Sequence, residues 1–481
     1  MIKPFGAAFA ATALAAVLAG CATTPAKTAT SGPVEAKPLP TGMDPALASD
    51  PYPSTYRALP SRPTAIVGAT ILTATGQQID NGTILFADGK IVGVGAGLAV
   101  PAGYDTVDGR GKWVTPGVID AHSHLGVYPS PGVQGMSDGN EATSPNTAQV
   151  WAEHSLWPQD AGFNTARAGG VTTLLILPGS ANLFGGRSVT VKNVPSRSMQ
   201  GMKFPGAPYG LKMACGENPS RVYGGRNQSP ATGMGNVAGY RAAWINAAEY
   251  ARKWDDYREK VRKKEKADPP KRDLQLDTLA GVLRGEILVQ NHCYRADEML
   301  VMIDVAKEFG YKISAFHHTV EAYKIADVLA REGICTATWS GWWGFKMEAL
   351  DAIEENAAMV HRAGGCAVIH SDDDILTQRL NQEAANALGA ANHAGMNISK
   401  ADAVKWFTAN PAKMLGILDR TGTLEAGKMA DVVLWSADPF SVYARADKVF
   451  VDGALIYDRR DPRFQPKSDF EVGEPGREPA R

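Results

Sequence analysis

The sequence lacks an excess of charge of either sign. Its 481 residues include 49 basic and 50 acidic side chains, which gives a formal net charge of -1. A chain so close to neutrality has no overall field that would attract a nucleic acid or another polyanion. We therefore expect no nucleic-acid partner and predict that the chain binds a small molecule. The composition leaves open whether it forms a homo-oligomer.

Cysteines are few and widely spaced. Cys215, Cys293, Cys335 and Cys366 follow one N-terminal cysteine, Cys21, and no two of them are close in the sequence. Their spacing therefore predicts neither a metal-binding knuckle nor a disulfide framework. We expect four buried free thiols, although an oxidising compartment would permit a bridge.

Long apolar runs are also missing, except near the N-terminus. Residues 5–18 form an alanine-rich run after the basic Lys3, and this run is too short for a comfortable membrane span. An apolar run that ends in small residues is typical of an exported protein. The sequence Leu18-Ala19-Gly20-Cys21 resembles a bacterial lipoprotein box. The resemblance implies that Cys21 carries lipid and holds the mature chain to a membrane in the periplasm. Ala22 after the cysteine favours the outer membrane; an ordinary signal peptide cleaved near Ala22 is the alternative.

Short strands occur toward both ends of the chain. Hydrophobic residues make up 44% of the sequence and charged residues 21%, which is enough apolar material for a sizeable core. Between Thr64 and Val100, alternating apolar segments are separated by turn dipeptides such as Asp88-Gly89. The same alternating apolar pattern occurs again at residues 431–435 and 448–453. The pattern predicts two half-sheets that together form a small β-sandwich domain.

The middle of the chain alternates strands with helices. Apolar strands at residues 287–292, 312–318, 334–339 and 366–372 are separated by helical patterns. Repetition of such units over roughly 300 residues favours a closed (β/α)₈ barrel of the TIM type, in the α/β class. An open doubly wound sheet is the alternative, but no Gly-x-Gly-x-x-Gly follows the first strand.

These patterns divide the chain into segments. The stretch rich in Thr, Ala, Pro and Ser after Cys21 is typical of a flexible tether. Residues 218–280 interrupt the alternation of strands and helices, and their charged residues predict a solvated surface helix. The predicted segments are a signal peptide with its lipobox (1–21), the tether (22–60), the first half of the β-sandwich (61–115), the barrel (116–418) with an insertion (218–280), the second half of the β-sandwich (419–462) and a C-terminal tail (463–481).

The segment Val114–Gly126 carries the first chemical motif. His122 and His124 are separated by one residue on a predicted strand, so both imidazoles can reach one cation at about 2.0 to 2.1 Å. The strand runs into a loop rich in Gly and Pro, where a barrel places its active site. Residues 115–124, Thr-Pro-Gly-Val-Ile-Asp-Ala-His-Ser-His, resemble the first-strand signature of the amidohydrolase superfamily. The resemblance extends over about residues 64–460 and is strongest with members grouped with imidazolonepropionase and the metal-dependent dipeptidases.

The resemblance implies further metal ligands at the ends of later strands. His292 and His318 would bind a second cation. His317 competes with His318, but the run from His318 to Tyr323 resembles the family's His-x-x-Glu-Ala-Tyr sequence. Because adjacent residues of a strand face opposite sides, we expect only one of the two histidines to reach the metal directly.

The strand that ends in His370-Ser371-Asp372 resembles the family's last barrel strand. The resemblance implies that Asp372 binds metal and takes a proton from the attacking water. We expect Asp373 and Asp374 to cap the following helix. His370, like His154, His361 and His393, is expected to be a structural or surface histidine.

Lys212 lies on a strand that resembles the lysine-containing strand of the family's binuclear dipeptidases. In those enzymes the lysine reacts with carbon dioxide and the resulting carbamate bridges two cations. An ammonium group cannot bind a cation, so without this modification the chain would hold a single metal. Glu217 is the alternative carboxylate.

Two clusters could contact a substrate. One is aromatic and begins at Trp339, which suits an organic substrate. The other contains Asn218, Arg221 and Tyr223, in which the arginine offers a planar fork of donors for a carboxylate. Either cluster could equally serve packing.

The resemblance therefore implies a metal-dependent hydrolase that cleaves an amide, peptide or cyclic amide C–N bond. Its cofactor would be one or two divalent cations, and imidazole-rich ligands favour Zn²⁺. A mononuclear hydrolytic deaminase is one alternative. A non-catalytic binding lipoprotein is another, but such a protein would lack some of these ligands.

Overall fold

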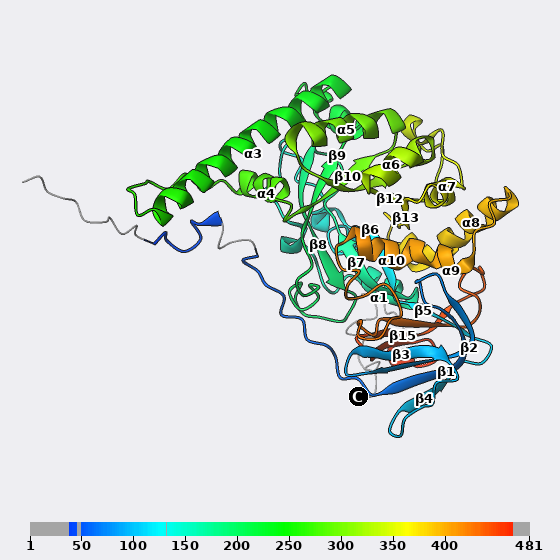
Figure 1. The fold of residues 1–481 in the computed structure, drawn as a ribbon. Helices are drawn as coiled ribbons and strands as arrows, with labels where there is room; N and C mark the ends of the chain where they lie inside the picture. Colours follow the sequence, from blue (N-terminus) through cyan, green and yellow to red (C-terminus); the bar gives the residue numbers. More distant parts are fainter. Residues whose placement is uncertain (1–37, 46–49, 131, 465–481) are drawn as a thin grey trace, which may run out of the picture.

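Two β-sheets organise the computed structural model, which describes residues 38–45, 50–130 and 132–464. Figure 1 shows that the larger sheet is surrounded by helices, whereas the smaller sheet packs against one end of this α/β part. No helix in the described ranges combines the length and the hydropathy needed to cross a membrane. The larger sheet carries most of the predicted site residues.

The larger sheet is a nearly closed barrel of eight strands. Its two edge strands meet where the backbone N–H of Asp372 donates to the carbonyl of His122 at 2.9 Å. In sheet order, which is also chain order, the strands are β6 (Val118–Ser123), β7 (Val171–Ile176), β8 (Phe184–Lys192), β9 (Gly210–Ala214), β10 (Leu288–Cys293), β11 (Ile313–His318), β12 (Cys335–Thr338) and β13 (Cys366–Ile369). The predicted eight-stranded α/β barrel is therefore confirmed.

One strand departs from the predicted (β/α)₈ pattern. Strand β8 runs antiparallel to both β7 and β9, whereas the other paired neighbours are parallel. Residues 177–183 connect β7 to β8 without a helix. A parallel partner needs a crossover of a dozen or more residues, so this short link permits only a hairpin. The expectation of eight identical βα units was wrong at this strand.

Helices cover the outside of the barrel. Gly310 and Gly333 end α5 and α6 in the left-handed conformation that glycine adopts without strain. The helices are α1 (Ala161–Ala168), α2 (Glu217–Gly224), α3 (Gly233–Arg262), α4 (Leu274–Leu283), α5 (Ala296–Phe309), α6 (Ala326–Glu332), α7 (Asn356–Arg362), α8 (Leu380–His393), α9 (Lys400–Ala403) and α10 (Ala409–Met414). Short 3₁₀ segments are η2 (Gln134–Met136), η3 (Ala152–His154), η4 (Ala322–Ile325), η5 (Met347–Ala349), η6 (Leu376–Arg379), η7 (Val404–Phe407) and η8 (Pro462–Phe464).

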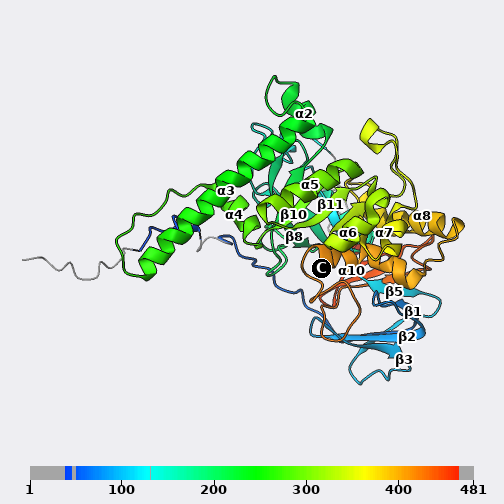
Figure 2. The ribbon, with the colours of Figure 1, turned by 45° about the horizontal axis from the view of Figure 1, so that its top comes forward.

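The insertion forms the longest of these helices, α3. Figure 2 shows α3 passing α5 and extending beyond the barrel. Its charged face is solvated, as predicted, but Tyr240, Trp244 and Trp254 are buried on the other face. The helix is therefore attached to the barrel by packing rather than being exposed on all sides.

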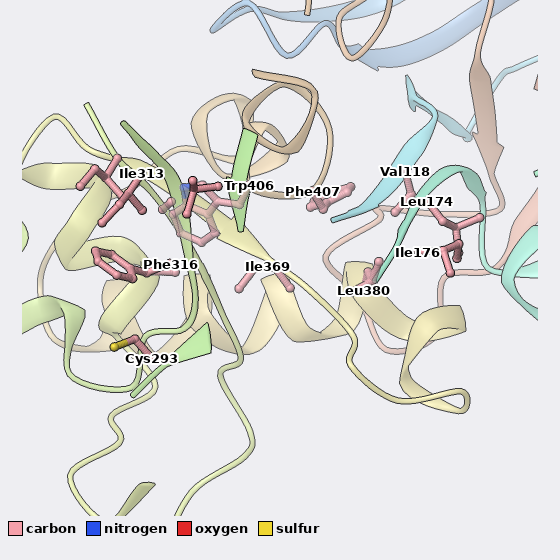
Figure 3. Packing of buried hydrophobic residues seen from close by; sticks show 14 of the residues in the cluster. Val118, Leu174, Ile176, Cys293, Ile313, Phe316, Ile369, Leu380, Trp406 and Phe407 are labelled. Atoms are coloured by element: carbon pink, nitrogen blue, oxygen red, sulfur yellow. The ribbon is translucent and has the colours of Figure 1, made fainter. Parts of the chain in front are cut away.

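The core lies mainly between the barrel strands and the helices. Figure 3 shows part of this core, in which residues of the strands pack against Leu380, Trp406 and Phe407. Inside the barrel, small side chains such as Ala315, Ala337 and Val368 form a separate buried cluster. These packed layers support the strand ends that carry the site.

The smaller sheet joins the two ends of the chain. Strand β5 pairs with β1 from the N-terminal part and with β14 from the C-terminal part. The order is β16-β15-β14-β5-β1-β2-β3, with β4 beside β1, and the bounds are β1 (Thr64–Leu72), β2 (Gln78–Ala87), β3 (Lys90–Ala96), β4 (Asp105–Asp108), β5 (Trp113–Pro116), β14 (Val432–Trp435), β15 (Ala446–Val451) and β16 (Ala454–Asp458). The two half-sheets thus form one sheet. The second layer of the predicted sandwich is not confirmed.

Residues before the first strand lie against the barrel. The sequence predicts a flexible tether up to residue 60, yet Thr55 N–H donates to the carbonyl of Gln200 at 3.0 Å. Asp50 accepts from the buried Lys203 at 2.9 Å. Backbone and side-chain hydrogen bonds therefore hold the chain from Asp50 onward, and sequence composition does not reveal them.

All four cysteines of the folded part form disulfides. Cys215 pairs with Cys293, and Cys335 pairs with Cys366. Cys335 and Cys366 are also register partners on β12 and β13. Neighbouring strands thus bring together cysteines that are far apart in sequence, so the prediction of free thiols was wrong.

A buried ionic cluster connects the barrel to the smaller sheet. The ammonium of Lys192, on β8, lies 2.7 Å from Asp452 and 3.4 Å from Asp431. Tyr56 also donates a hydrogen bond to Asp452. Lys192 is fully buried, and its single positive charge lies between two carboxylates that have little access to water.

We expect Lys192→Met to reduce the free energy of unfolding by about 3–5 kcal/mol, because it leaves two buried carboxylates without their cation. Urea denaturation measures this change. Lys307→Met is the matched control, since Lys307 pairs with Glu332 at the surface and its side chain is 58% exposed; exposed pairs contribute little. An equally small effect of both substitutions would contradict a structural role for the buried cluster.

Candidate metal centre

The predicted metal ligands converge at the carboxyl-terminal ends of the barrel strands. Asp372 Oδ1 lies 3.2 Å from His122 Nε2 and 3.1 Å from His124 Nε2, and Asp372 Oδ2 lies 3.8 Å from His318 Nδ1. A cavity of about 320 Å³ is lined by these four residues together with His292. The structure thus brings together five side chains from the ends of four strands, β6, β10, β11 and β13.

His317 and His318 both turn toward the barrel axis. His318 lines the cavity, whereas His317 lies deeper, with its Nδ1 2.9 Å from His122 Nδ1 and its Nε2 2.8 Å from Gln290 Oε1. His318 and Thr319 have positive φ angles of 72° and 38°. This left-handed turn ends the strand alternation, so the expectation that adjacent histidines face opposite sides was wrong here. The preference for His318 as the ligand stays a prediction.

His370 is a candidate that sequence reasoning missed. It is fully buried, and its ring stacks on that of His122 with centroids 4.9 Å apart. Nitrogen atoms of His122, His318 and His370 lie within 4.8 Å of one another. Strand alternation could have found it: Val368 faces the barrel interior, so His370 and Asp372 share that face. His370 is therefore a candidate ligand beside His122 and His318.

The imidazole nitrogens of this cluster fit a cation. Both ring nitrogens of His292 and of His370, and Nδ1 of His318, are buried without a hydrogen-bond partner among the described residues. Burial lowers the pKa of each of these three rings, so they are neutral and carry a free lone pair. Unpaired buried polar atoms are costly. A bound divalent cation would satisfy them.

Asp372 supplies a negative charge to this neutral cluster. Burial opposes its ionisation, but His318, His124 and His370 hold the pKa of its carboxyl below the usual value. The residue also has a positive φ of 59°, which is uncommon for a residue other than glycine. Strained backbone of this kind is concentrated at functional sites.

Lys212 lies next to the histidines rather than at the surface. Its Nζ is 3.2 Å from His122 Nε2, and its side chain is almost fully buried. Burial lowers the pKa of Lys212 to about 8. The uncharged amine is therefore more populated near neutral pH than in an ordinary exposed lysine. Glu217, the alternative carboxylate, lies at the rim of the cavity, 3.4 Å from Lys346.

Asp120 is a second residue that sequence reasoning missed. Its buried carboxylate accepts hydrogen bonds from the Ser371 hydroxyl, from the backbone N–H of Ser371 and His122 at 3.2 Å each, and from Thr377 Oγ1 at 3.1 Å. It connects the strand before His122 to the residue before Asp372. Its position in the sequence, two residues before His122 on the same strand, could have indicated that it belongs to the site.

Asp373 has the capping role that the sequence predicts. Its Oδ1 accepts from the backbone N–H of Ile375 at 2.9 Å and of Leu376 at 2.8 Å. It therefore accepts hydrogen bonds from the backbone N–H groups at the start of η6 and does not point to the histidines.

The four predicted substrate contacts divide into two groups. Asn218 and Arg221 line the cavity. Tyr223 does not, because its hydroxyl donates to the carbonyl of Ser144 at 2.6 Å and lies 2.7 Å from Asn182 Oδ1. Trp339 is buried behind His318, with ring centroids 4.6 Å apart. Neither residue lines the cavity, so a substrate contact by Tyr223 or Trp339 stays a prediction.

The sequence profile of the amidohydrolase family matches residues 113–456. The chain belongs to the amidohydrolase family. Its membership confirms the predicted superfamily and enzyme class, hydrolases of C–N bonds.

Three relatives show the extent of the similarity. Amidohydrolase tasK of Hapsidospora irregularis is 32% identical over 79% of the chain, which spans only 39% of that protein's length. The imidazolonepropionase of Mesorhizobium japonicum is 25% identical over 75% of the chain and 87% of that protein. A crystal structure of an amidohydrolase from Thermotoga maritima MSB8 is 34% identical, with a TM-score of 0.75, covering 82% of this chain and 100% of that one.

We expect His122→Ala and His124→Ala each to remove most bound metal while the fold persists, because the barrel is stabilised by packing below the site. Metal content by mass spectrometry and secondary structure by circular dichroism measure the two effects. His393→Ala is the control, since His393 is exposed at the end of α8. Full metal retention in either test variant would show that the first-strand motif does not bind the cation.

Proposed function

We propose that the chain hydrolyses an amide, peptide or cyclic amide C–N bond with the help of one or two divalent cations, most suitably Zn²⁺. The observation that carries this proposal is the set of buried, neutral and unpartnered imidazoles beside the Asp372 carboxylate. Imidazole nitrogen with carboxylate oxygen is a typical ligand set for zinc. Membership of the amidohydrolase family supports the same reaction class.

The ligands divide into two groups in this proposal. His122, His124 and Asp372 would hold one cation, and their ligand atoms lie within 4.8 Å of one another. His292 and His318 would hold a second, and their rings are 4.4 Å apart. His370 lies against His122 and His318 and is a further ligand for either position.

Lys212 would join the two positions as a carbamate. Its uncharged amine can add carbon dioxide, which forms an N–C bond and releases a proton. The lowered pKa of Lys212, caused by burial, favours the amine form that this addition requires. The resulting carboxylate would lie beside His122, since Nζ is 3.2 Å from its Nε2.

Asp372 would carry the proton transfer of the reaction. A bound divalent cation would make a nearby water more acidic and a substrate carbonyl more electrophilic. Asp372 accepts the proton of the attacking water and delivers it to the leaving nitrogen as the C–N bond breaks. Its lowered pKa keeps the carboxylate ionised near neutral pH, and the ionised carboxylate is the form that can accept a proton.

A mononuclear deaminase is the second candidate. His122, His124 and Asp372 already form one compact group that needs no modified lysine. In that case Lys212 would stay a buried amine, and water would replace an amino group on a ring carbon, with release of ammonia, instead of cleaving an amide. Metal stoichiometry separates the two candidates.

We also propose that the protein is an outer-membrane lipoprotein that faces the periplasm. Cys21 lies outside the described residues, and two disulfides in the described part of the chain support this proposal. The disulfides Cys215–Cys293 and Cys335–Cys366 suit an oxidising compartment such as the periplasm.

We expect Asp372→Asn to reduce kcat by about 10² or more while metal content falls only modestly, since the amide keeps an oxygen ligand but cannot accept the proton. Asp373→Asn is the matched control, because Asp373 only caps η6. Both variants are assayed at equal metal occupancy on amide substrates. Near-normal turnover by Asp372→Asn, or a larger loss in Asp373→Asn, would refute the assignment.

We expect Cys21→Ala to release the protein from the membrane fraction or to block its maturation, because the cysteine thiol is the site of lipid attachment. Fractionation of cells that express each version measures the distribution. Recovery of the variant with membranes, to the same extent as the wild type, would count against the lipoprotein proposal.

A further inference from the structure

The carboxyl-terminal end of α3 extends beyond the barrel, and the first described residues of the chain lie against it. Leu39 packs on the buried face of this helix. Arg258, near the helix end, lies 3.6 Å from Asp44. Figure 2 shows residues 38–45, in blue, beside this end of α3. The described part of the chain therefore begins at the end of α3 that points away from the barrel.

The same end of α3 carries an excess of positive charge, although the whole chain is nearly neutral. Residues 252–272 contain ten basic and five acidic side chains. Three of the five acids form ion pairs within the segment, whereas Glu265 and Asp268 form none with the residues described. Five basic side chains, which we name the basic tip, are exposed and form no hydrogen bond or ion pair with any described residue: Lys260, Arg262, Lys264, Lys266 and Lys271.

Stabilisation of the helix end accounts for only part of this charge. Cations interact favourably with the helix dipole only within the last turn. Lys260 and Arg262 lie in that turn of α3. Lys264, Lys266 and Lys271 lie beyond it, in the link to α4. Because clustered like charges repel one another, these lysines gain from contact with an anionic surface.

Two exposed apolar side chains adjoin the basic tip. Arg272, which follows the last residue of the tip, donates a hydrogen bond to the carbonyl of Gly42. Met43 and Leu274 flank this contact in the sequence and are 47% and 56% exposed. Segments that bind at a membrane surface combine basic side chains with apolar ones that enter the boundary between headgroups and acyl chains. This end of the molecule offers both.

We propose that the basic tip docks on a membrane surface that contains anionic phospholipid, beside the lipid attached to Cys21. This inference rests on the proposed lipid anchor. Cys21 precedes Leu39 by 18 residues, and no chain of that length spans more than about 65 Å. The anchor therefore keeps the tip within reach of the membrane. Basic residues and an acyl group together bind anionic membranes more tightly than either does alone.

Docking by this end of α3 holds the metal site away from the membrane. The helix contains 30 residues, which corresponds to a length of about 45 Å. At its other end, Asn236 donates to the carbonyl of Gly216 at 2.9 Å, next to Glu217 at the rim of the cavity. The cavity thus lies near the end of α3 that is far from the lipid, and its substrate arrives from the aqueous side.

Binding of the full chain without its lipid tests the basic tip separately. Purified Cys21→Ala is sedimented with vesicles of phosphatidylcholine alone and with vesicles of equal parts phosphatidylcholine and phosphatidylglycerol. We expect at least about tenfold tighter binding to the anionic vesicles, because each basic residue near such a surface strengthens binding severalfold. Any binding through the apolar N-terminal run is common to both compositions. Added salt should weaken the preference, since it screens exposed charges.

Substitutions in the same background identify the residues responsible. The combined changes Lys260→Gln, Lys264→Gln and Lys266→Gln should remove most of the preference for anionic vesicles. The matched control replaces three exposed lysines on β3, before β11 and on α10, and should keep the preference: Lys90→Gln, Lys312→Gln and Lys413→Gln. Circular dichroism verifies that both triple variants retain the fold.

Three results would overturn the inference. These are equal binding to both kinds of vesicle, an undiminished preference in the variant of the tip, and binding of soluble polyglutamate without binding of anionic vesicles, which would indicate an acidic protein partner. Failure of the lipid anchor would show differently, because mass spectrometry of the mature wild-type chain would then find no acyl group on Cys21. The vesicle measurement does not depend on that result.

Discussion

The buried carboxylate of Asp120 is the interaction on which the site depends. The barrel sheet closes between β13 and β6, and Asp120 bridges this seam by accepting from Ser371 on one side and from the His122 backbone on the other. Burial raises the pKa of Asp120 to about 6, although four donors act in the opposite direction. The cost of burying this group is offset by hydrogen bonds, and these same bonds fix His122 and Asp372 relative to each other.

A layered arrangement follows from this seam. Small apolar side chains fill the barrel interior, His317 and Gln290 lie above them, and the cavity histidines form the outermost layer. Burial keeps the imidazoles of His292 and His318 neutral, and their nitrogens without hydrogen-bond partners among the described residues cost stability. The site is therefore organised to gain from a cation, and the left-handed backbone at His318 and Asp372 aims both side chains toward it.

Sequence reasoning located most of the site because strand ends are visible as sequence patterns. His122, His124, His292 and Asp372 follow apolar segments, and parallel strands bring such positions to one rim. It failed where local backbone geometry breaks the alternation, as at His317 and His318, and where a role depends on partners distant in sequence. Asp120 acts through Ser371, and the disulfides depend on strand adjacency. The reversal of β8 came from a link too short for a crossover, which composition did not indicate.

The central claim is that the histidine cluster holds catalytic metal, and the metal content of the gently purified wild-type protein tests it most directly. Inductively coupled plasma mass spectrometry, normalised to protein concentration, gives the number and kind of ions per chain. The account predicts at least one divalent transition-metal ion, with two ions where Lys212 is carboxylated and one for the deaminase alternative. A protein that contains no such ion, and acquires none when incubated with excess Zn²⁺, would contradict the account.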